Sequence, residues 1–394
     1  MLGRSGGVLR VGDLCDSRPV TNRTLTVREL GRATLARQHL LGRSDLSTAA
    51  MLEHLIGLQA QAPEPPYFAL WTRIRGFTPD RLSDLIASRE VVRIALMRGT
   101  VFAVTAPDAL ALRSWMQPLL TRALRTDTQH AAGLAGIDHT ALFEFAAELV
   151  RHEPRTGQEL GRLLAERFPG YEPGALAYAV RGLLPLVQVP PRGLWGRSGL
   201  PRLALLDHWV GRGGESLPPL APEPVALVRR YLAAFGPASA RDAQAWSGLT
   251  GLGEIFDALR PDLTVFRDEN GVELFDLPDA PRPDPATPAP VRILAQYDNV
   301  LLSHADRTRL VSDADRRRLV TKNGIVHAAV LVGGTVAGSV RRTTTRRSAL
   351  LEVTPWRRLT NTNRSAIEAE GMRLLKFSAP GADDREVRIL PEAH

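Results

Sequence analysis

The feature that most constrains the fold is a recurring order of elements, in which two or three predicted helices lead into two short strands joined by a tight turn. The clearest copy has strands at 263–267 and 272–277, which flank the hairpin-turn sequence Asp268-Glu269-Asn270-Gly271. Predicted helices precede this hairpin at 224–235, 238–246 and 253–259. Helices followed by such a hairpin predict a winged helix.

A second copy lies upstream. Thr156 and Pro173 are suited to begin two helices, and the apolar run 186–189 predicts a strand after them. Pro190 to Gly193 then forms a predicted turn, and 194–196 is the expected return strand. Winged helices most often bind DNA, with one helix in a groove and the hairpin on the backbone. The alternative is that such units only contact protein or stack on each other.

The chain is long enough for several domains, and its order of elements predicts an α+β, mostly helical protein. A Gly- and Arg-rich stretch opens the chain, and we expect it to be a disordered tail. A Pro-rich linker, 278–290, precedes a strand-rich part with a Gly333-Gly334 hairpin turn and a closing helix at 361–376. The expected divisions are the tail at 1–24, winged-helix units at 25–152, 153–220 and 221–280, and a β-rich, DNA-contacting region at 281–394.

Two glutamines, Gln59 and Gln61, stand where an apolar run with helical spacing meets Pro63, Pro65 and Pro66. Proline cannot continue a helix, so the two amides are expected at a helix end where the chain reverses. Side chains at such reversals tend to face a cleft or solvent. The alternative is that the amide pair only ties down the Pro-rich turn.

The formal net charge of +8 and a pI near 10.4 suit a polyanionic partner, although codon bias in a GC-rich genome would also enrich arginine. Arg341, Arg342, Arg346 and Arg347 crowd together between two predicted strands. A hairpin tip with four guanidinium groups could enter a minor groove or clamp phosphates. The alternative is a charged guard on an edge strand or a solvated loop.

Several classes of site are excluded. The only cysteine, Cys15, rules out a disulfide within one chain and a cysteine-based zinc site. No Gly-rich segment carries the Lys-Ser/Thr of a phosphate-binding loop, and no apolar run is long enough to span a membrane. His304 with Asp306 could hold a metal, but a surface turn is the favoured interpretation. We therefore expect no metal, no cofactor and no membrane contact, in a cytoplasmic, nucleoid-associated monomer.

An ordered series of stretches runs from about Leu25 to the closing helix, and each stretch alone is weak. The series is 56–63 with Tyr67, Leu70, Trp71 and Arg73; Arg98-Gly99-Thr100; 190–196; Phe235-Gly236-Pro237 with Asp242 and Trp246; and 297–307. In this order the stretches resemble the AlkZ/YcaQ family of bacterial winged-helix DNA glycosylases.

The resemblance implies three tandem winged helices in a C-shape around double-stranded DNA, with a C-terminal β-barrel-like region. It implies that Gln59 and Gln61 are catalytic, in the Gln-x-Gln form of the branch that unhooks azinomycin-type interstrand crosslinks. The expected function is a monofunctional DNA glycosylase that hydrolyses the N-glycosidic bond of N7-alkylated guanine. Such a base is cationic and leaves as a neutral base, so amides that position water suffice. The alternative function is a tandem winged-helix DNA-binding regulator without catalysis.

Overall fold

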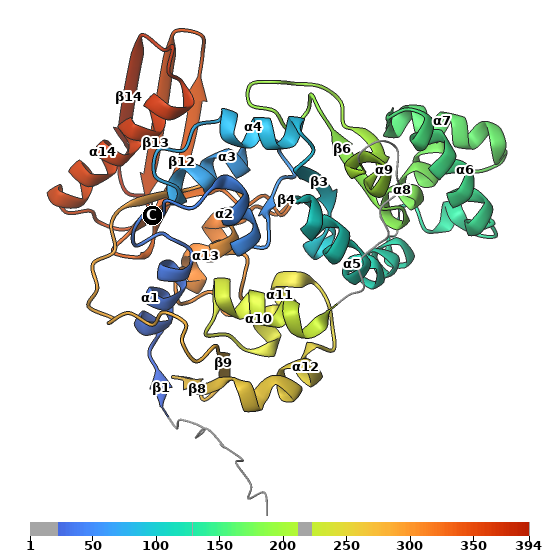
Figure 1. Cartoon of the computed structure of the whole chain (residues 1–394). Coiled ribbons are helices and arrows are strands. Elements are labelled where there is room, and N and C mark those ends of the chain that lie inside the picture. Colours follow the sequence, from blue (N-terminus) through green and yellow to red (C-terminus); the bar gives the residue numbers. More distant parts are fainter. Residues whose placement is uncertain (1–22, 128, 212–222, 394) are drawn as a thin grey trace, which may run out of the picture.

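The computed structural model describes residues 23–127, 129–211 and 223–393, so residues 1–22 of the tail predicted at 1–24 lie outside the described residues (Figure 1). The description of the second predicted unit likewise lacks 212–220. Figure 1 shows α6 to α8 at one end of the molecule and α14 with β12 to β14 at the other. Among the described residues, no helix combines the length and apolar content that a membrane crossing requires.

Helices of the first half begin largely where the sequence places a cap. Thr26, Ser47, Asp138 and Thr156 each accept a hydrogen bond from a first-turn backbone N–H, and for Thr26 and Thr156 a glutamate completes a capping box. The helices are α1 (Val27–Arg37), α2 (Thr48–His54), α3 (Pro65–Arg73), α4 (Asp80–Ala87), α5 (Ala106–Thr126), α6 (His139–His152), α7 (Gly157–Arg167), α8 (Pro173–Leu183) and α9 (Leu206–Val210).

One six-stranded sheet runs through the first two predicted units, in the order β2-β4-β3-β6-β7-β5. Arg93 pairs with Gln188 and Ile94 with Val187, so the hairpin of the first unit adjoins that of the second. The strands are β2 (Leu58–Gln59), β3 (Val91–Ala95), β4 (Val101–Thr105), β5 (Arg155–Thr156), β6 (Leu186–Val189) and β7 (Arg202–Leu205). This sheet crosses the expected division at residue 153.

The return strand of the second hairpin is not where the sequence predicted it. Residues 194–196 form a turn, and β7 is the strand that pairs with β6. Gly193, Gly196 and Gly199 all have positive φ, which keeps this stretch from running as a strand. Tyr67 fixes the turn, because its hydroxyl donates to the Gly193 carbonyl at 2.6 Å.

The third predicted unit has the expected order of helices and hairpin. Its helices are α10 (Pro224–Phe235), α11 (Ala240–Ser247) and α12 (Leu252–Leu259), and its hairpin joins β8 (Thr264–Asp268) to β9 (Glu273–Asp276). The hairpin gains a strand that the sequence did not predict, since β1 (Thr24–Leu25) pairs parallel with β8. The beginning of the described chain is therefore part of this unit.

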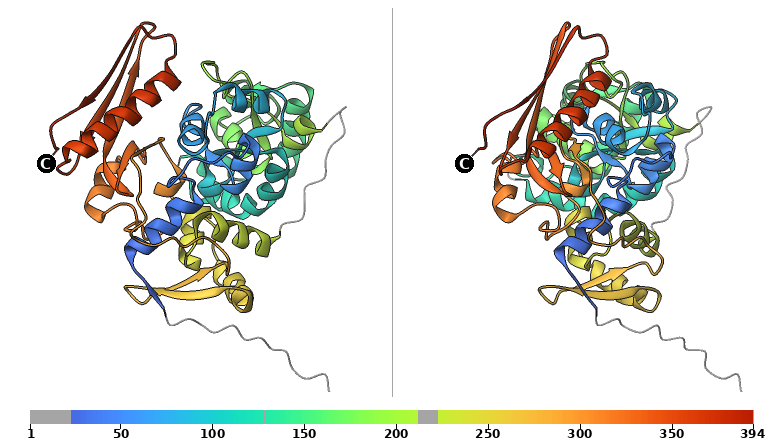
Figure 2. Two further views of the ribbon diagram at one scale, coloured as in Figure 1. Left: turned by 60° about the vertical axis from the view of Figure 1, so that its left-hand side comes forward. Right: turned by 90° about the vertical axis from the view of Figure 1, so that its left-hand side faces the viewer.

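The C-terminal region is an open sheet, and the expectation of a barrel-like region is wrong for the described residues. The strand order β10-β11-β12-β13-β14 is linear, and no pairing joins its two edges. Figure 2 shows β12 to β14 and α14 extending away from the helical body. The elements are β10 (Arg292–Leu294), α13 (Asp313–Leu319), β11 (Ala328–Val332), β12 (Thr335–Thr344), β13 (Ser348–Pro355), α14 (Asn361–Ser378) and β14 (Asp384–Ile389).

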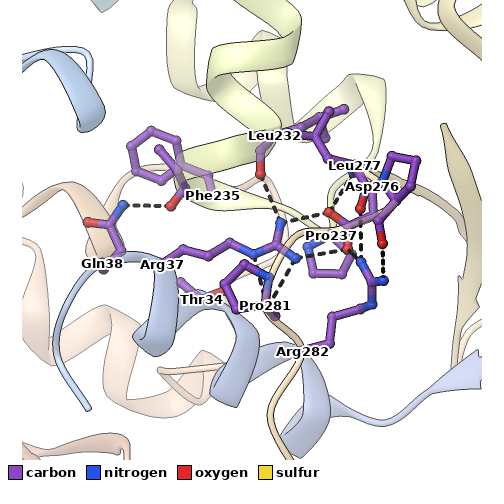
Figure 3. Close-up of polar contacts among 12 residues, drawn as sticks. Thr34, Arg37, Gln38, Leu232, Phe235, Pro237, Asp276, Leu277, Pro281 and Arg282 are labelled. Carbon is purple, nitrogen blue, oxygen red and sulfur yellow. Dashed lines mark hydrogen bonds and ion pairs between the residues drawn. The ribbon is translucent and has the colours of Figure 1, made fainter. Parts of the chain in front are cut away.

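Fully buried ion pairs connect the parts of the chain. Asp298, which follows β10, receives both terminal nitrogens of Arg73 on α3 at 2.7 and 2.9 Å. Asp276 on β9 binds Arg37 on α1 at 2.7 and 2.8 Å and also pairs with the partly exposed Arg282 (Figure 3). Buried charges are tolerated only when paired in this way, so these contacts fix how the elements meet.

His304 is buried, so the surface turn expected for it is wrong. Its Nε2 lies 2.9 Å from the Phe235 carbonyl, and it must carry the proton there because a carbonyl only accepts. Burial lowers the pKa of His304 to about 3, the charge of Arg309 acts in the same direction, and Asp242 opposes them. The ring is therefore neutral at neutral pH, and Asp306 lies exposed on the neighbouring turn.

The buried His304 predicts acid sensitivity of the fold. Between pH 6.5 and about 3 the unfolded chain binds a proton at this ring that the folded chain does not. Stability should then fall as pH drops through this window, by up to about 1.4 kcal/mol per pH unit from this residue. The variant His304→Gln, whose amide can still donate to Phe235, should show a shallower decline in urea-unfolding midpoint than the native protein.

His152→Gln is the matched control, because His152 lies exposed at the end of α6. It should keep the native pH profile. Equal slopes for the native protein and His304→Gln would show that His304 does not titrate across this window on unfolding.

Candidate active site

Gln59 and Gln61 do not lie at the end of a helix as expected. The helix α2 ends at His54, and Ile56 and Gly57 take positive φ values of 55° and 86°, which turn the chain into β2. Leu58 then pairs with Ala103 and Gln59 with Phe102 on β4. The two glutamines, two positions apart, are thus presented along an edge of the six-stranded sheet.

Gly57 is needed in this turn for space as well as for its backbone conformation. A Cβ built on it would lie 2.3 Å from Val104 Cγ1 and 3.0 Å from the Ala103 carbonyl oxygen. Asn299 holds the turn from the other side, donating from Nδ2 to the Gly57 carbonyl at 2.9 Å. The backbone that leads into Gln59 is therefore clamped between β4 and the loop after β10.

Arg98 orients the Gln59 amide. Its Nη2 donates to Gln59 Oε1 at 2.8 Å, and its Nη1 donates to the Trp246 carbonyl of α11 at 2.6 Å. Burial lowers the pKa of Arg98 to about 10, with the charge of Arg307 acting in the same direction, so the group stays cationic at neutral pH. A charge-assisted hydrogen bond thus fixes which end of the largely buried Gln59 amide is the oxygen.

Gln61 is held by the same turn. Its Oε1 accepts from the Val101 backbone N–H at 3.3 Å, and its side chain is exposed. The stretch Arg98 to Val101 therefore donates to both glutamine oxygens. An amide oxygen has two lone pairs, so each glutamine keeps one acceptor position for a water molecule or a substrate group. The same turn thus sets the position of both amide oxygens.

The four arginines of the expected hairpin tip fall into two groups. Arg346 and Arg347 are exposed in the β12–β13 turn, and Arg347 pairs with Asp383 at 3.2 Å. Arg341 and Arg342 belong to β12 itself, so the picture of four guanidinium groups at one tip is wrong. The run of β-prone threonines carries the strand up to Thr344 and leaves only a short turn.

Arg342 connects this strand to the segment after the glutamines. Its Nη2 lies 2.6 Å from Glu64 Oε2, and its guanidinium carbon is 4.9 Å from the centre of the Phe68 ring. Both Arg341 and Arg342 line a 560 Å³ pocket that Glu64, Phe68 and Arg318 share. Arg342 thus lies close to the loop after Gln61, whereas Arg346 and Arg347 lie farther along the hairpin.

Neither Arg98 nor Asn299 is recognisable as a site residue from the sequence alone. Both stand inside stretches that carried the family resemblance, Arg98-Gly99-Thr100 and 297–307. Their roles depend on partners 39 and 242 positions away in the chain, which no local pattern reveals. Within the described ranges, no three His, Cys, Asp or Glu side chains gather as a metal site would require.

A sequence model of the AlkZ-like DNA glycosylase family matches residues 52–377. No curated protein sequence matches the chain. Among solved structures, the Streptomyces sahachiroi DNA glycosylase AlkZ is similar in fold, with a TM-score of 0.75 and 20% sequence identity. That similarity covers 93% of this chain and 100% of the other. The matched region contains both glutamines, Arg98 and Asn299.

The crowding at Gly57 generates a prediction about stability and site geometry. Gly57→Ala should lower the free energy of unfolding by about 2–5 kcal/mol, because a left-handed alanine costs about 1–2 kcal/mol and overpacking against Val104 adds about 1–3 kcal/mol. Gly76→Ala is the matched control, since Gly76 has a φ of 61° but nothing within 4 Å of its added Cβ.

The control should lose only the backbone contribution, about 1–2 kcal/mol. Urea unfolding of both variants checks the difference. Equal losses would show that packing against Val104 does not constrain the turn before Gln59.

Proposed function

The chain belongs to the family of AlkZ-like DNA glycosylases, and on that premise we propose that it hydrolyses the N-glycosidic bond of N7-alkylated guanine in double-stranded DNA. Monofunctional hydrolysis is proposed, with no covalent enzyme–DNA intermediate. We include unhooking of azinomycin-type interstrand crosslinks, whose guanines are alkylated at the same atom. Family membership favours this enzyme over a regulator without catalysis.

The observation that supports this substrate is the pair of amides held by one turn. Neither Gln59 nor Gln61 can act as a strong acid or base near neutral pH, so neither can protonate an ordinary base. An N7-alkylated guanine is already cationic, and it becomes neutral as the bond to the sugar breaks. Its departure therefore requires a positioned water and acceptors that face the positive sugar.

The fixed orientation of Gln59 adds to this mechanism. Arg98 occupies one lone pair of its Oε1, so the amide cannot flip and offer its NH₂ group in place of the oxygen. The remaining lone pair of Gln59 and that of Gln61 can then accept from the attacking water. Such preorganisation contributes because no side chain has to reorient during the reaction.

The wider architecture supports a duplex substrate. We interpret each set of helices with its hairpin as a winged helix and propose that the three units together form a C-shaped cradle for the duplex. In this proposal Arg346 and Arg347 contact the backbone or the minor groove, and Arg341 and Arg342 contribute from the adjacent strand. Both exposed tip residues have the charge and accessibility that a phosphate contact requires.

Substitution of the glutamines tests the proposed chemistry. Gln59→Ala and Gln61→Ala should each lower single-turnover release of 7-methylguanine from a defined duplex by about 100-fold or more, because each removes a fixed acceptor. The same variants should fail to unhook a duplex that carries an azinomycin crosslink. Gel assay of the cleaved abasic strand and mass spectrometry of released bases are the measurements.

Gln158→Ala is the matched control, because Gln158 is exposed on α7. It should retain native activity. Full activity of Gln59→Ala, or release of undamaged guanine by the native protein, would contradict the proposed mechanism.

The arginine hairpin gives an independent prediction. Arg346→Ala/Arg347→Ala should weaken binding to duplex DNA and reduce the slope of log K against log salt concentration by roughly two, about one for each phosphate that is no longer neutralised. Fluorescence anisotropy at several salt concentrations measures the slope. Arg388→Ala, on the same sheet and paired with Glu386 at 2.8 Å, should leave it nearly unchanged; an unaltered slope in the double variant would remove the hairpin from the interface.

A further inference from the structure

A small pocket opens beside Gln61 where the first and second predicted units share their sheet. Its volume is 170 Å³. Gln61, Gly99 and Val101 form the side next to the candidate active site, and β3, α5, α8, β6 and β7 supply the remaining walls. The wall residues are Ala95, Leu120, Ala123, Leu124, Tyr178, Arg181, Gly182, Leu186, Gln188 and Leu203.

The size and lining of this pocket suit a planar ring. A cavity of about 150 Å³ holds benzene, so this pocket has room for one aromatic ring system but not for a stretch of duplex. Leu120, Leu124, Leu186 and Leu203 form the apolar part of the wall, and polar side chains supply nearly as much of its surface. A small organic ring can bind where an apolar wall holds it and polar groups fix its orientation.

Tyr178 is an aromatic residue of the pocket lining, and a neighbouring ring packs against it. Its ring stacks on His130, with centroids 4.5 Å apart and planes inclined by 13°. His130 does not line the pocket, so it holds the Tyr178 ring without occupying that space. Asp127 in turn holds His130, with Oδ1 at 2.9 Å from Nδ1. The Tyr178 ring is thereby fixed in one orientation toward the pocket.

Gln188 contributes a hydrogen-bond acceptor to the pocket lining. Its Oε1 has no hydrogen-bond partner among the described residues, although it is buried. Such an atom is costly to leave unpaired, and rotation of the amide would bring it toward a bound donor. The N–H groups of a guanine edge are donors of the required kind.

We propose that this pocket binds the purine of an N7-alkylated monoadduct, which can leave the duplex as a crosslinked base cannot, with Tyr178 stacked on its cationic ring and Gln61 between the base and its sugar. This inference rests on the proposed function and adds the residues that select the base. An aromatic face attracts a cation more strongly than a neutral ring of the same shape, so Tyr178 favours the N7-alkylated base over undamaged guanine. Arg181 also lines the pocket, and its charge opposes a cationic ligand.

The binding experiment uses the purified full chain and the cationic nucleoside 7-methylguanosine, with guanosine as its neutral counterpart. Calorimetric titration should show a preference for the methylated nucleoside of at least roughly fivefold. Tyr178→Ala should abolish the preference and Tyr178→Phe should retain it, since phenylalanine keeps the ring. Tyr171→Ala, a tyrosine outside the pocket lining, should bind as the native protein does.

A kinetic experiment separates this inference from the proposed function. Tyr178→Ala should lower single-turnover release of 7-methylguanine from duplex DNA by roughly tenfold or more, and Tyr178→Phe should restore most of it. Native-like binding preference and release by Tyr178→Ala would overturn the pocket assignment while leaving the glycosylase proposal intact. A native protein that prefers 7-methylguanosine but releases no base would instead overturn the proposed reaction and leave the pocket standing.

Discussion

The buried pair of Arg73 with Asp298 is the interaction on which the candidate active site depends most. It joins α3, which follows the glutamines, to the loop after β10, and both side chains are fully buried. The next residue, Asn299, holds the Gly57 carbonyl and so sets the turn that leads into Gln59. Two adjacent residues of one loop thus fix α3 and the approach to β2 together. An unpaired charge at either end would be too costly in the interior to allow another arrangement.

The sequence correctly predicted elements whose position depends on nearby residues. The helix start at Thr156, the Gly333-Gly334 hairpin and the third set of helices all lie where their residues indicate. Prediction from the sequence failed for elements whose position depends on pairing with distant segments. The strand β1 exists because it pairs with β8 some 240 positions away. The return strand β7 and the open, linear strand order of the C-terminal sheet likewise depend on strand pairings. The turn residues in the sequence do not reveal those pairings.

The same division applies to the candidate site. The Gln-x-Gln spacing and the family series identified which residues to consider, and the structure brings Gln59 and Gln61 to one turn. The expectation of a helix end at the glutamines was wrong, because the left-handed Ile56 and Gly57 end the helical run early. Arg98 was unpredictable as a partner of Gln59, since nothing in a single sequence shows that a turn between β3 and β4 lies beside β2. Charge alone also misplaced Arg341 and Arg342, whose position follows from the length of β12.

The six-stranded sheet limits where this chain can be cut into separate fragments. Because β3 pairs with β6, separating the first two units would expose an unpaired strand edge on each fragment, and such edges promote aggregation. Neither unit therefore completes the sheet without the other, and a truncation intended to isolate one unit would have to redesign that edge.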